Sequence, residues 1–223
     1  MVRFGPVAFL LLAPLVPNSG RRHLARWLLG ARVAADAAVG ISLIDATRIE
    51  LGPSSSIGHF SIFRNLDALV LEKDARTGTF NWVFGARGTR HFAARPERTS
   101  ALVLGEGASV TSRHILDCTD RIDIGAFTTV AGFRSQLLTH SIDVTSNRQD
   151  CEPVVIGPYS FIGTGATLLK GSRFPARAVL AAGSVYSGRS GEEYQIFSGV
   201  PATPMKRLPE DAEYMRRRSP RVV

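Results

Sequence analysis

One histidine in the sequence lies close to acids that would let it work as a base. His140 belongs to the segment 138–143, which reads Leu-Thr-His-Ser-Ile-Asp, and Asp143 follows it by three residues. A neutral imidazole can take the proton of an alcohol while the alcohol oxygen attacks an acyl group, and an acid can hold the ring in place. Asp143 is one candidate for that acid and Asp117 is the other. A surface histidine without a role is the alternative.

Large apolar residues recur at every sixth position and must build the elements that position this histidine. The strictest run is Ile156, Ile162, Leu168, Phe174, Leu180 and Tyr186. Shorter runs with the same step are Val33 and Val39; Leu51, Ile57, Phe63 and Leu69; Leu104, Val110 and Leu116; and Ile124 and Val130. A helix repeats apolar positions every three or four residues and a strand every two, so neither explains this spacing. Three units of short strand plus turn per coil predict an all-β parallel β-helix, a triangular prism with its anchors inside.

The register of six breaks in two places, over 76–100 and 134–153, which predicts two inserted loops. Insertions project from a solenoid and often carry its function. The expected parts of the chain are an apolar and basic N-terminal segment at 1–32, the β-helix with its loops at 33–190, and a turn, a short helix at 209–218 and a basic tail within 191–223.

Several segments resemble the hexapeptide-repeat acyltransferases, and in particular their sugar and exopolysaccharide O-acetyltransferases. The similar segments are the loop at 138–143, the phrases at 117–120 and 122–125, and the stretches at 156–163 and 198–202. The resemblance covers residues 33–208 and supplies the left hand of the coils. It implies transfer of an acetyl group from acetyl-CoA to a hydroxyl of a sugar or glycan precursor, with His140 as general base.

The same resemblance implies where the substrates would bind. Coenzyme A would lie in the groove between neighbouring prisms of a homotrimer, against small turn residues that permit close approach. These are Gly163, Thr164, Gly165, Ala181, Ala182 and Gly183. Lys206 and Arg207 would contact the coenzyme phosphates, and His114, Trp82 and Asn147 are candidate contacts to the acceptor. The alternatives are ordinary prism corners, a solvated tail, and a structural role for His114.

The charge distribution limits the kinds of partner. The net charge is +8, yet residues 1–32 hold five arginines and no acid, residues 205–223 hold six basic residues against three acids, and the body between them has no net charge. A nucleic-acid enzyme usually carries its charge along the folded surface, so no nucleic-acid partner is expected. The two cysteines form no CxxC motif and indicate reduced thiols in a cytoplasmic protein.

The apolar stretch at 7–16 is shorter than the roughly 20 residues that a membrane span needs. One interpretation is a helix packed on the body of the protein or on a partner subunit. The other is an interfacial anchor, apolar in the headgroup region and with arginines on anionic lipid. The second predicts peripheral membrane contact through residues 1–26, at the inner face of the membrane.

Three further functions stay open at this point. The acceptor can be a small amine or antibiotic instead of a sugar. The same fold hosts zinc carbonic anhydrases, but these need three histidine ligands, and the histidines at 59, 91, 114 and 140 include no close pair, so no metal is expected. A non-catalytic β-helix scaffold is the third, and it would have no need of the loop around His140.

Overall fold

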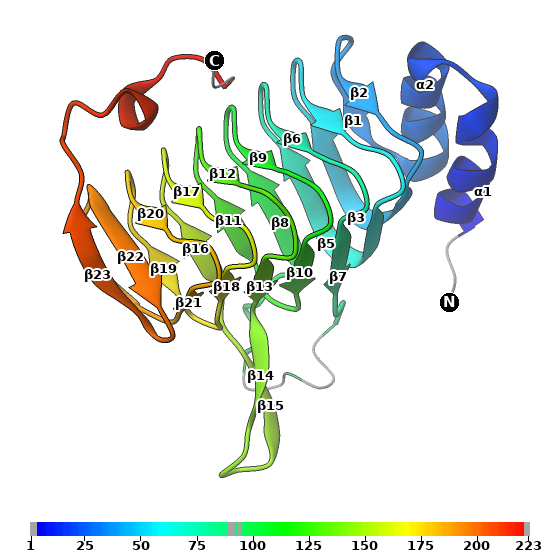
Figure 1. Cartoon of the computed structure of the whole chain (residues 1–223). Coiled ribbons are helices and arrows are strands. Elements are labelled where there is room, and N and C mark those ends of the chain that lie inside the picture. Colours follow the sequence, from blue (N-terminus) through cyan, green and yellow to red (C-terminus); the bar gives the residue numbers. More distant parts are fainter. Residues whose placement is uncertain (1–3, 89–91, 93–94, 221–223) are drawn as a thin grey trace.

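The computed structural model, which describes residues 4–88, 92 and 95–220, is a left-handed parallel β-helix (Figure 1). Its parallel strands form three faces of a triangular prism. The first and third faces join into one 12-stranded sheet, and the second face is a 9-stranded sheet. The prediction of an all-β parallel β-helix is confirmed.

The first face holds the later parts of β3 (Leu43–Leu51) and β5 (Ile62–Leu71), with β1 (Arg32–Val33), β8 (Ala101–Leu104), β11 (Ile122–Ile124), β16 (Val154–Ile156) and β19 (Arg173–Phe174). The second holds β2 (Ala38–Val39), β4 (Ser56–Ile57), β6 (Arg76–Thr77), β9 (Ser109–Val110), β12 (Thr129–Val130), β17 (Phe161–Ile162), β20 (Val179–Leu180), β22 (Gln195–Gly199) and β23 (Ala202–Arg207). The third holds the first parts of β3 and β5, with β7 (Trp82–Gly85), β10 (Ile115–Cys118), β13 (Gln136–Leu138), β18 (Thr167–Leu168) and β21 (Val185–Tyr186).

The apolar anchors fill the inside of the prism. All six members of the run from Ile156 to Tyr186 are buried, and consecutive coils place them on top of one another. The register differs from the prediction after Phe63. Leu71, not Leu69, aligns with Leu51 and Leu104, because β5 continues from one face to the next as a single bent strand. Leu69 is buried as well, two residue pairs earlier in the same ladder.

The first predicted insertion is shorter than expected. Residues 76–85 belong to a regular coil, in which Thr77 and Val83 continue the step of six from Leu71 and point into the core. This coil has no clear sequence signal, because Thr77 takes the place of an apolar anchor. The inserted loop therefore runs only between Gly85 and Ala101.

Two helices close the N-terminal end of the prism (Figure 1): α1 (Phe4–Leu12) and α2 (Asn18–Leu29), joined by the short η1 (Ala13–Leu15). The first coil has an open edge whose backbone groups need partners. Asn18 bonds to the carbonyl of Ala37 and the N–H of Val39, and Arg21 donates to the carbonyl of Val39 at 2.6 Å. Arg22 donates to the same Ala37 carbonyl at 3.3 Å, and Arg26 donates to the Val33 carbonyl at 2.6 Å.

Three of the N-terminal arginines, Arg21, Arg22 and Arg26, thus bond to the coil edge, which weakens their interpretation as a lipid-binding cluster. Phe4, Leu11, Leu15 and Trp27 nevertheless remain exposed on these helices. Over the described part of the chain, no helix is long and apolar enough to cross a membrane. Peripheral contact through residues 1–26 stays a prediction.

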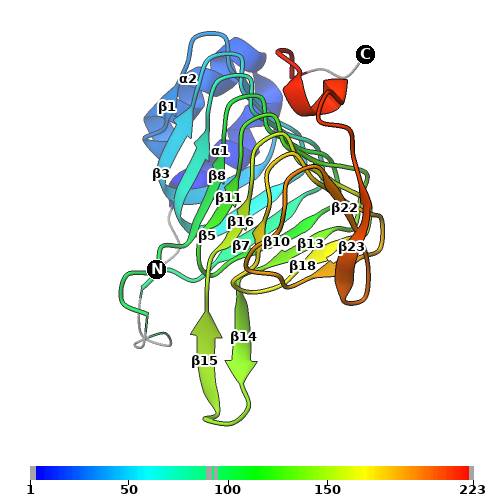
Figure 2. The same cartoon turned by 90° about the vertical axis from the view of Figure 1, so that its left-hand side faces the viewer.

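The C-terminal segment also differs from the prediction. The helix expected at 209–218 is a single 3-10 turn, η2 (Glu213–Arg216). The segment runs back along the prism (Figures 1 and 2), where Tyr214 donates a hydrogen bond to the carbonyl of Ser160 and the Arg217 guanidinium lies 3.8 Å from the Tyr214 ring. Packing along the prism thus replaces further helical turns.

Candidate active site

The second inserted loop is an antiparallel hairpin of β14 (His140–Asp143) and β15 (Arg148–Cys151), which projects from the prism (Figure 2). His140 lies at its base. Thr139 fixes this base to the third face, since its hydroxyl donates to the Asp117 carbonyl at 2.6 Å and accepts the N–H of Asp120 at 2.8 Å. The N–H of Glu152 bonds to the Thr139 carbonyl and closes the hairpin. A rigid element therefore presents His140.

Asp117 holds the His140 ring. Nδ1 of His140 lies 2.8 Å from Oδ2 of Asp117, and Oδ1 of Asp117 accepts the N–H of Thr119 at 2.9 Å. Asp117 is only 3 % exposed, and each of its carboxylate oxygens has a hydrogen-bond partner, as a buried charge requires. An ionised Asp117 accepts only, which places the ring proton on Nδ1 and leaves Nε2 as the basic nitrogen.

Asp143 does not contact His140. Its carboxylate accepts the N–H of Thr145 and the hydroxyl of Ser146 in the hairpin turn, and these bonds lower the pKa of Asp143. Successive side chains of a strand point to opposite faces, so residues three apart, such as His140 and Asp143, cannot share one. Of the two acids expected from the sequence, the structure brings only Asp117 to the ring.

Two residues that the sequence did not suggest complete the surroundings of the ring. Nε2 of His140 lies 3.0 Å from Oε1 of Gln149 on the opposite strand. Phe92 packs edge-on against the imidazole, with ring centres 6.0 Å apart, and Arg98 lies 4.5 Å from the centre of the Phe92 ring. A hairpin prediction would have suggested Gln149. It is paired directly with Ile142 across the strands, and Ile142 lies on the same face of its strand as His140, two residues away.

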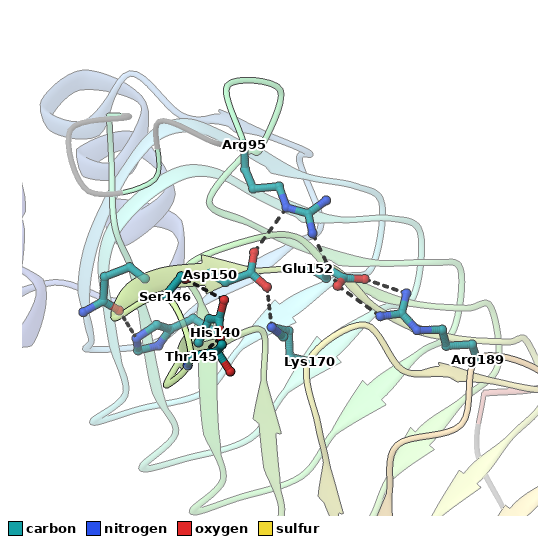
Figure 3. Close-up of polar contacts among 10 residues, drawn as sticks. Arg95, His140, Thr145, Ser146, Asp150, Glu152, Lys170 and Arg189 are labelled. Atoms are coloured by element: carbon teal, nitrogen blue, oxygen red, sulfur yellow. Dashed lines mark hydrogen bonds and ion pairs between the residues drawn. The ribbon is translucent and has the colours of Figure 1, made fainter.

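A charged cluster holds the outer strand of the hairpin to the body (Figure 3). Asp150 bonds to Lys170 and to Arg95 at 3.3 Å. Glu152 bonds to Arg189 at 2.6 Å and to Arg95 at 3.4 Å. Lys170 lowers the pKa of Asp150 and Arg189 lowers that of Glu152. These contacts join both inserted loops to the last coils and keep the hairpin at a fixed angle.

His114 lies in a buried polar column at one corner of the prism. Each side chain in it accepts the N–H of the next member, in the order Ser42, Ser61, Asn81, His114 and Ser135. Nδ1 of His114 accepts the Ser135 N–H at 3.1 Å, so Nε2 carries the proton and faces the Thr111 hydroxyl at 2.9 Å. His114 is 1 % exposed, which assigns it to the core and not to a surface that an acceptor reaches.

Acid should therefore destabilise the fold through His114. Burial lowers the pKa of His114 from 6.5 to about 4. The unfolded chain takes up a proton below about pH 6.5 while the folded chain resists it, so stability falls from that pH towards pH 4, by on the order of 3 kcal/mol. Urea unfolding at neutral pH and at about pH 4.5 measures this loss. His114→Asn, which copies Asn81 in the preceding coil, should lose about 2 kcal/mol less, and an equal loss in both proteins would contradict the role.

The small residues expected at the donor site lie at one corner in two consecutive coils. Gly163–Gly165 and Ala181–Gly183 stack on each other, with the Gly183 N–H bonded to the Thr164 carbonyl at 2.9 Å. A Cβ on Gly163 would lie 2.6 Å from the Ala182 nitrogen, so coil stacking alone requires that glycine. Gly165 and Gly183 have positive φ and open space where a Cβ would be. At these two positions the corner presents backbone without a side chain, which leaves room for a narrow group to approach the main chain.

Lys206 and Arg207 lie away from this corner. Strand β23 runs antiparallel to β22. Gly199 stays near the corner because its N–H donates to the Ser184 hydroxyl, and Ala202 is paired with Gly199, while Lys206 and Arg207 lie at the other end of the strand pair. Arg207 is also engaged by Glu210 at 3.1 Å and by Glu192 at 3.6 Å. Within one chain, the structure does not bring these two residues to the glycine corner.

The remaining candidates are exposed. Trp82 projects outward from β7 and is 56 % exposed. Asn147 occupies the hairpin turn with φ of 52°.

Cys118 and Cys151 are free and buried. His59 Nδ1 accepts the N–H of Ile41, and His91 lies outside the described residues. Across the ranges that the structure describes, no three His, Cys, Asp or Glu side chains are grouped as a metal site.

Comparison with solved structures agrees with the fold. A hexapeptide-repeat-containing acetyltransferase from Vibrio cholerae superposes with a TM-score of 0.54 at 18 % identity, over 93 % of this chain and 91 % of that one. A polysialic acid O-acetyltransferase superposes with a TM-score of 0.60 at 14 % identity, over 79 % and 84 %. The chain shares their fold. No family model and no curated protein sequence matches it.

Proposed function

We propose that this protein is an acyltransferase that moves an acetyl group from acetyl-CoA to a hydroxyl of a sugar or glycan precursor. The observation that carries the proposal is the bond between His140 and buried Asp117 at the base of a rigid hairpin. A pure scaffold has no need of a half-exposed histidine held in one tautomer. The acetyltransferases among proteins of the same fold support the choice of reaction.

The residues have distinct parts in this reaction. His140 takes the hydroxyl proton at Nε2 as the acceptor oxygen attacks the acetyl carbonyl, and Asp117 stabilises the imidazolium that forms. Acetyl-CoA supplies an activated acetyl group on a good leaving group, so no covalent enzyme intermediate is needed. His140 then returns the proton to the departing sulfur. Gln149 accepts a hydrogen bond from protonated Nε2 between the two transfers.

The donor would lie along the corner formed by Gly163–Gly165 and Ala181–Gly183. Open space beside Gly165 and Gly183 fits a narrow chain with amide groups that bond to the backbone. Lys206 and Arg207 would reach the phosphates of a donor bound to a neighbouring chain, which is compatible with the predicted homotrimer. The trimer itself stays a prediction.

A panel of acceptors incubated with acetyl-CoA tests the proposal through release of the free thiol. We expect release that depends on both a hydroxyl-bearing saccharide and the protein, and an acetyl ester in the product by mass spectrometry. Small amines and antibiotics serve as the competing acceptors in the same panel. Acetylation of amines alone, or no release with any acceptor, would contradict the proposed reaction.

A further inference from the structure

A cavity of about 720 Å³ lies beside the candidate catalytic pair, between helix α1 and the third face of the prism. Its walls come from α1, the first parts of β3 and β5, strand β7 and the start of the first inserted loop. Phe84 in its lining is paired directly with Asp117 on the adjacent strand. The cavity is therefore one strand away from the acid that holds His140.

One side of the cavity is aromatic. Trp82 and Phe84 meet edge to face with centres 6.2 Å apart, and Trp82 leaves much of its ring open. Side chains two apart on a strand share a face, so both point outward with Asp117. An open indole face next to polar groups suits a ligand with one apolar side and many hydroxyls, such as a pyranose ring.

The floor of the cavity is built and rigid. Arg87 bonds to the Asp45 carboxylate at 2.7 Å and to the carbonyls of Asp45 and Leu66, both at 2.8 Å. Asp45 also accepts the N–H of Asn65 at 3.1 Å, and the Asn65 amide donates to Gly85 at 2.9 Å. These groups satisfy one another and need no ligand.

Arg64 is different. It is exposed in the cavity lining and, among the described residues, its guanidinium has neither an ion pair nor a hydrogen bond. Because Arg87 and Asp45 neutralise each other, Arg64 gives the cavity a net positive charge. A planar guanidinium binds carboxylate or phosphate oxygens through two parallel hydrogen bonds.

We propose that this cavity is the acceptor subsite and that the acceptor is an anionic saccharide. Its carboxylate or phosphate group binds Arg64 and a sugar ring lies against Trp82, which directs a hydroxyl towards His140. This inference rests on the proposed acetyl transfer and adds the class of acceptor. Carboxylate and phosphate share the same chemistry at Arg64, so the experiment separates them.

Calorimetric titration of the full chain tests the subsite without any turnover. The ligands are a glucuronic acid oligosaccharide, a neutral glucose oligosaccharide of the same length, and glucose 1-phosphate. Arg64→Gln should weaken binding of the preferred anionic ligand at least about tenfold and leave the neutral one unchanged, since a hydrogen bond to a charged group is worth about one decade or more in affinity. Trp82→Ala should weaken both kinds of saccharide. Arg76→Gln on the second face is the matched control and should change nothing.

Several outcomes would overturn the subsite. Equal affinities for charged and neutral sugars, or no anionic ligand that binds, would remove the role of Arg64. A change in sedimentation on Arg64→Gln, with unchanged binding, would assign the cavity to a contact between copies of the chain. Thiol release with neutral sugars alone would overturn the anionic acceptor and leave the proposed acetyl transfer standing.

Discussion

Replacement of His140 by alanine should lower kcat for acetyl transfer by about 10²–10⁴-fold, the usual contribution of a positioned general base. Without the imidazole, the acceptor hydroxyl must lose its proton to water while it attacks. Affinity for acetyl-CoA should stay within a factor of about two. The imidazole acts in proton transfer and not in donor binding, and the proposed donor corner lies in other coils. Steady-state thiol release gives kcat, and titration of the donor gives the affinity.

The variant should keep its fold, because the His140 side chain is 35 % exposed and outside the prism core. Its melting temperature should fall, since the buried carboxylate of Asp117 loses one of its hydrogen-bond partners. A circular dichroism spectrum like that of the unaltered protein, with a cooperative thermal transition, checks the fold. His23→Ala, at an exposed position of α2, is the matched control and should keep full activity. Retention of activity by His140→Ala would contradict the proposed mechanism and would assign the hairpin a binding or structural role.

The coils were predictable from the sequence because their physics is local and repeated. Anchors such as Ile156, Ile162 and Leu168 each lie on their own strand, and these strands belong to repeated units of the same kind, a short strand plus a turn. The step of six is therefore visible in the sequence. The step is lost where the backbone departs from that unit. Thr77 replaces an apolar anchor, and β5 bends through a corner where Asn65 has φ of 61° instead of making a separate turn. Neither feature has a strong sequence signal.

The basic charge of the N-terminus shows a second kind of limit. Composition reveals five arginines near an apolar stretch, which suits a lipid surface as well as a protein interior. The open edge of the first coil decides between these interpretations for Arg21 and Arg26, whose guanidinium groups bond to its carbonyls. Such an edge becomes apparent only when the whole stack is assembled.

The identity of the acid beside His140 was undetermined for a related reason. Asp143 is near in sequence, but the alternation of a strand turns it away, whereas Asp117 arrives from 23 residues upstream through the pairing of β10 with β13. The hairpin then brings Gln149 to the other ring nitrogen. Sequence proximity is therefore a poor guide to contact in a solenoid, where the nearest neighbours lie one coil apart.

Asp117→Asn should lower kcat by about 10²-fold or more, although the amide has nearly the same size as the carboxylate. The neutral amide cannot stabilise the imidazolium, and its NH₂ group can donate to Nδ1 and hold the ring in the tautomer with its proton on Nε2. The matched variant Asp143→Asn removes a charge from the same hairpin but touches no group that reacts, so its kcat should change by less than about twofold.

Thiol release measures both variants, and thermal unfolding separates a loss of catalysis from a loss of fold. In Asp117→Asn, the N–H of Thr119 can still donate to the side-chain oxygen if the new amide keeps that oxygen in the place of Oδ1, which preserves the local turn. A large loss in Asp143→Asn with little loss in Asp117→Asn would mean that the hairpin rearranges in the working enzyme and that Asp143 orients the base.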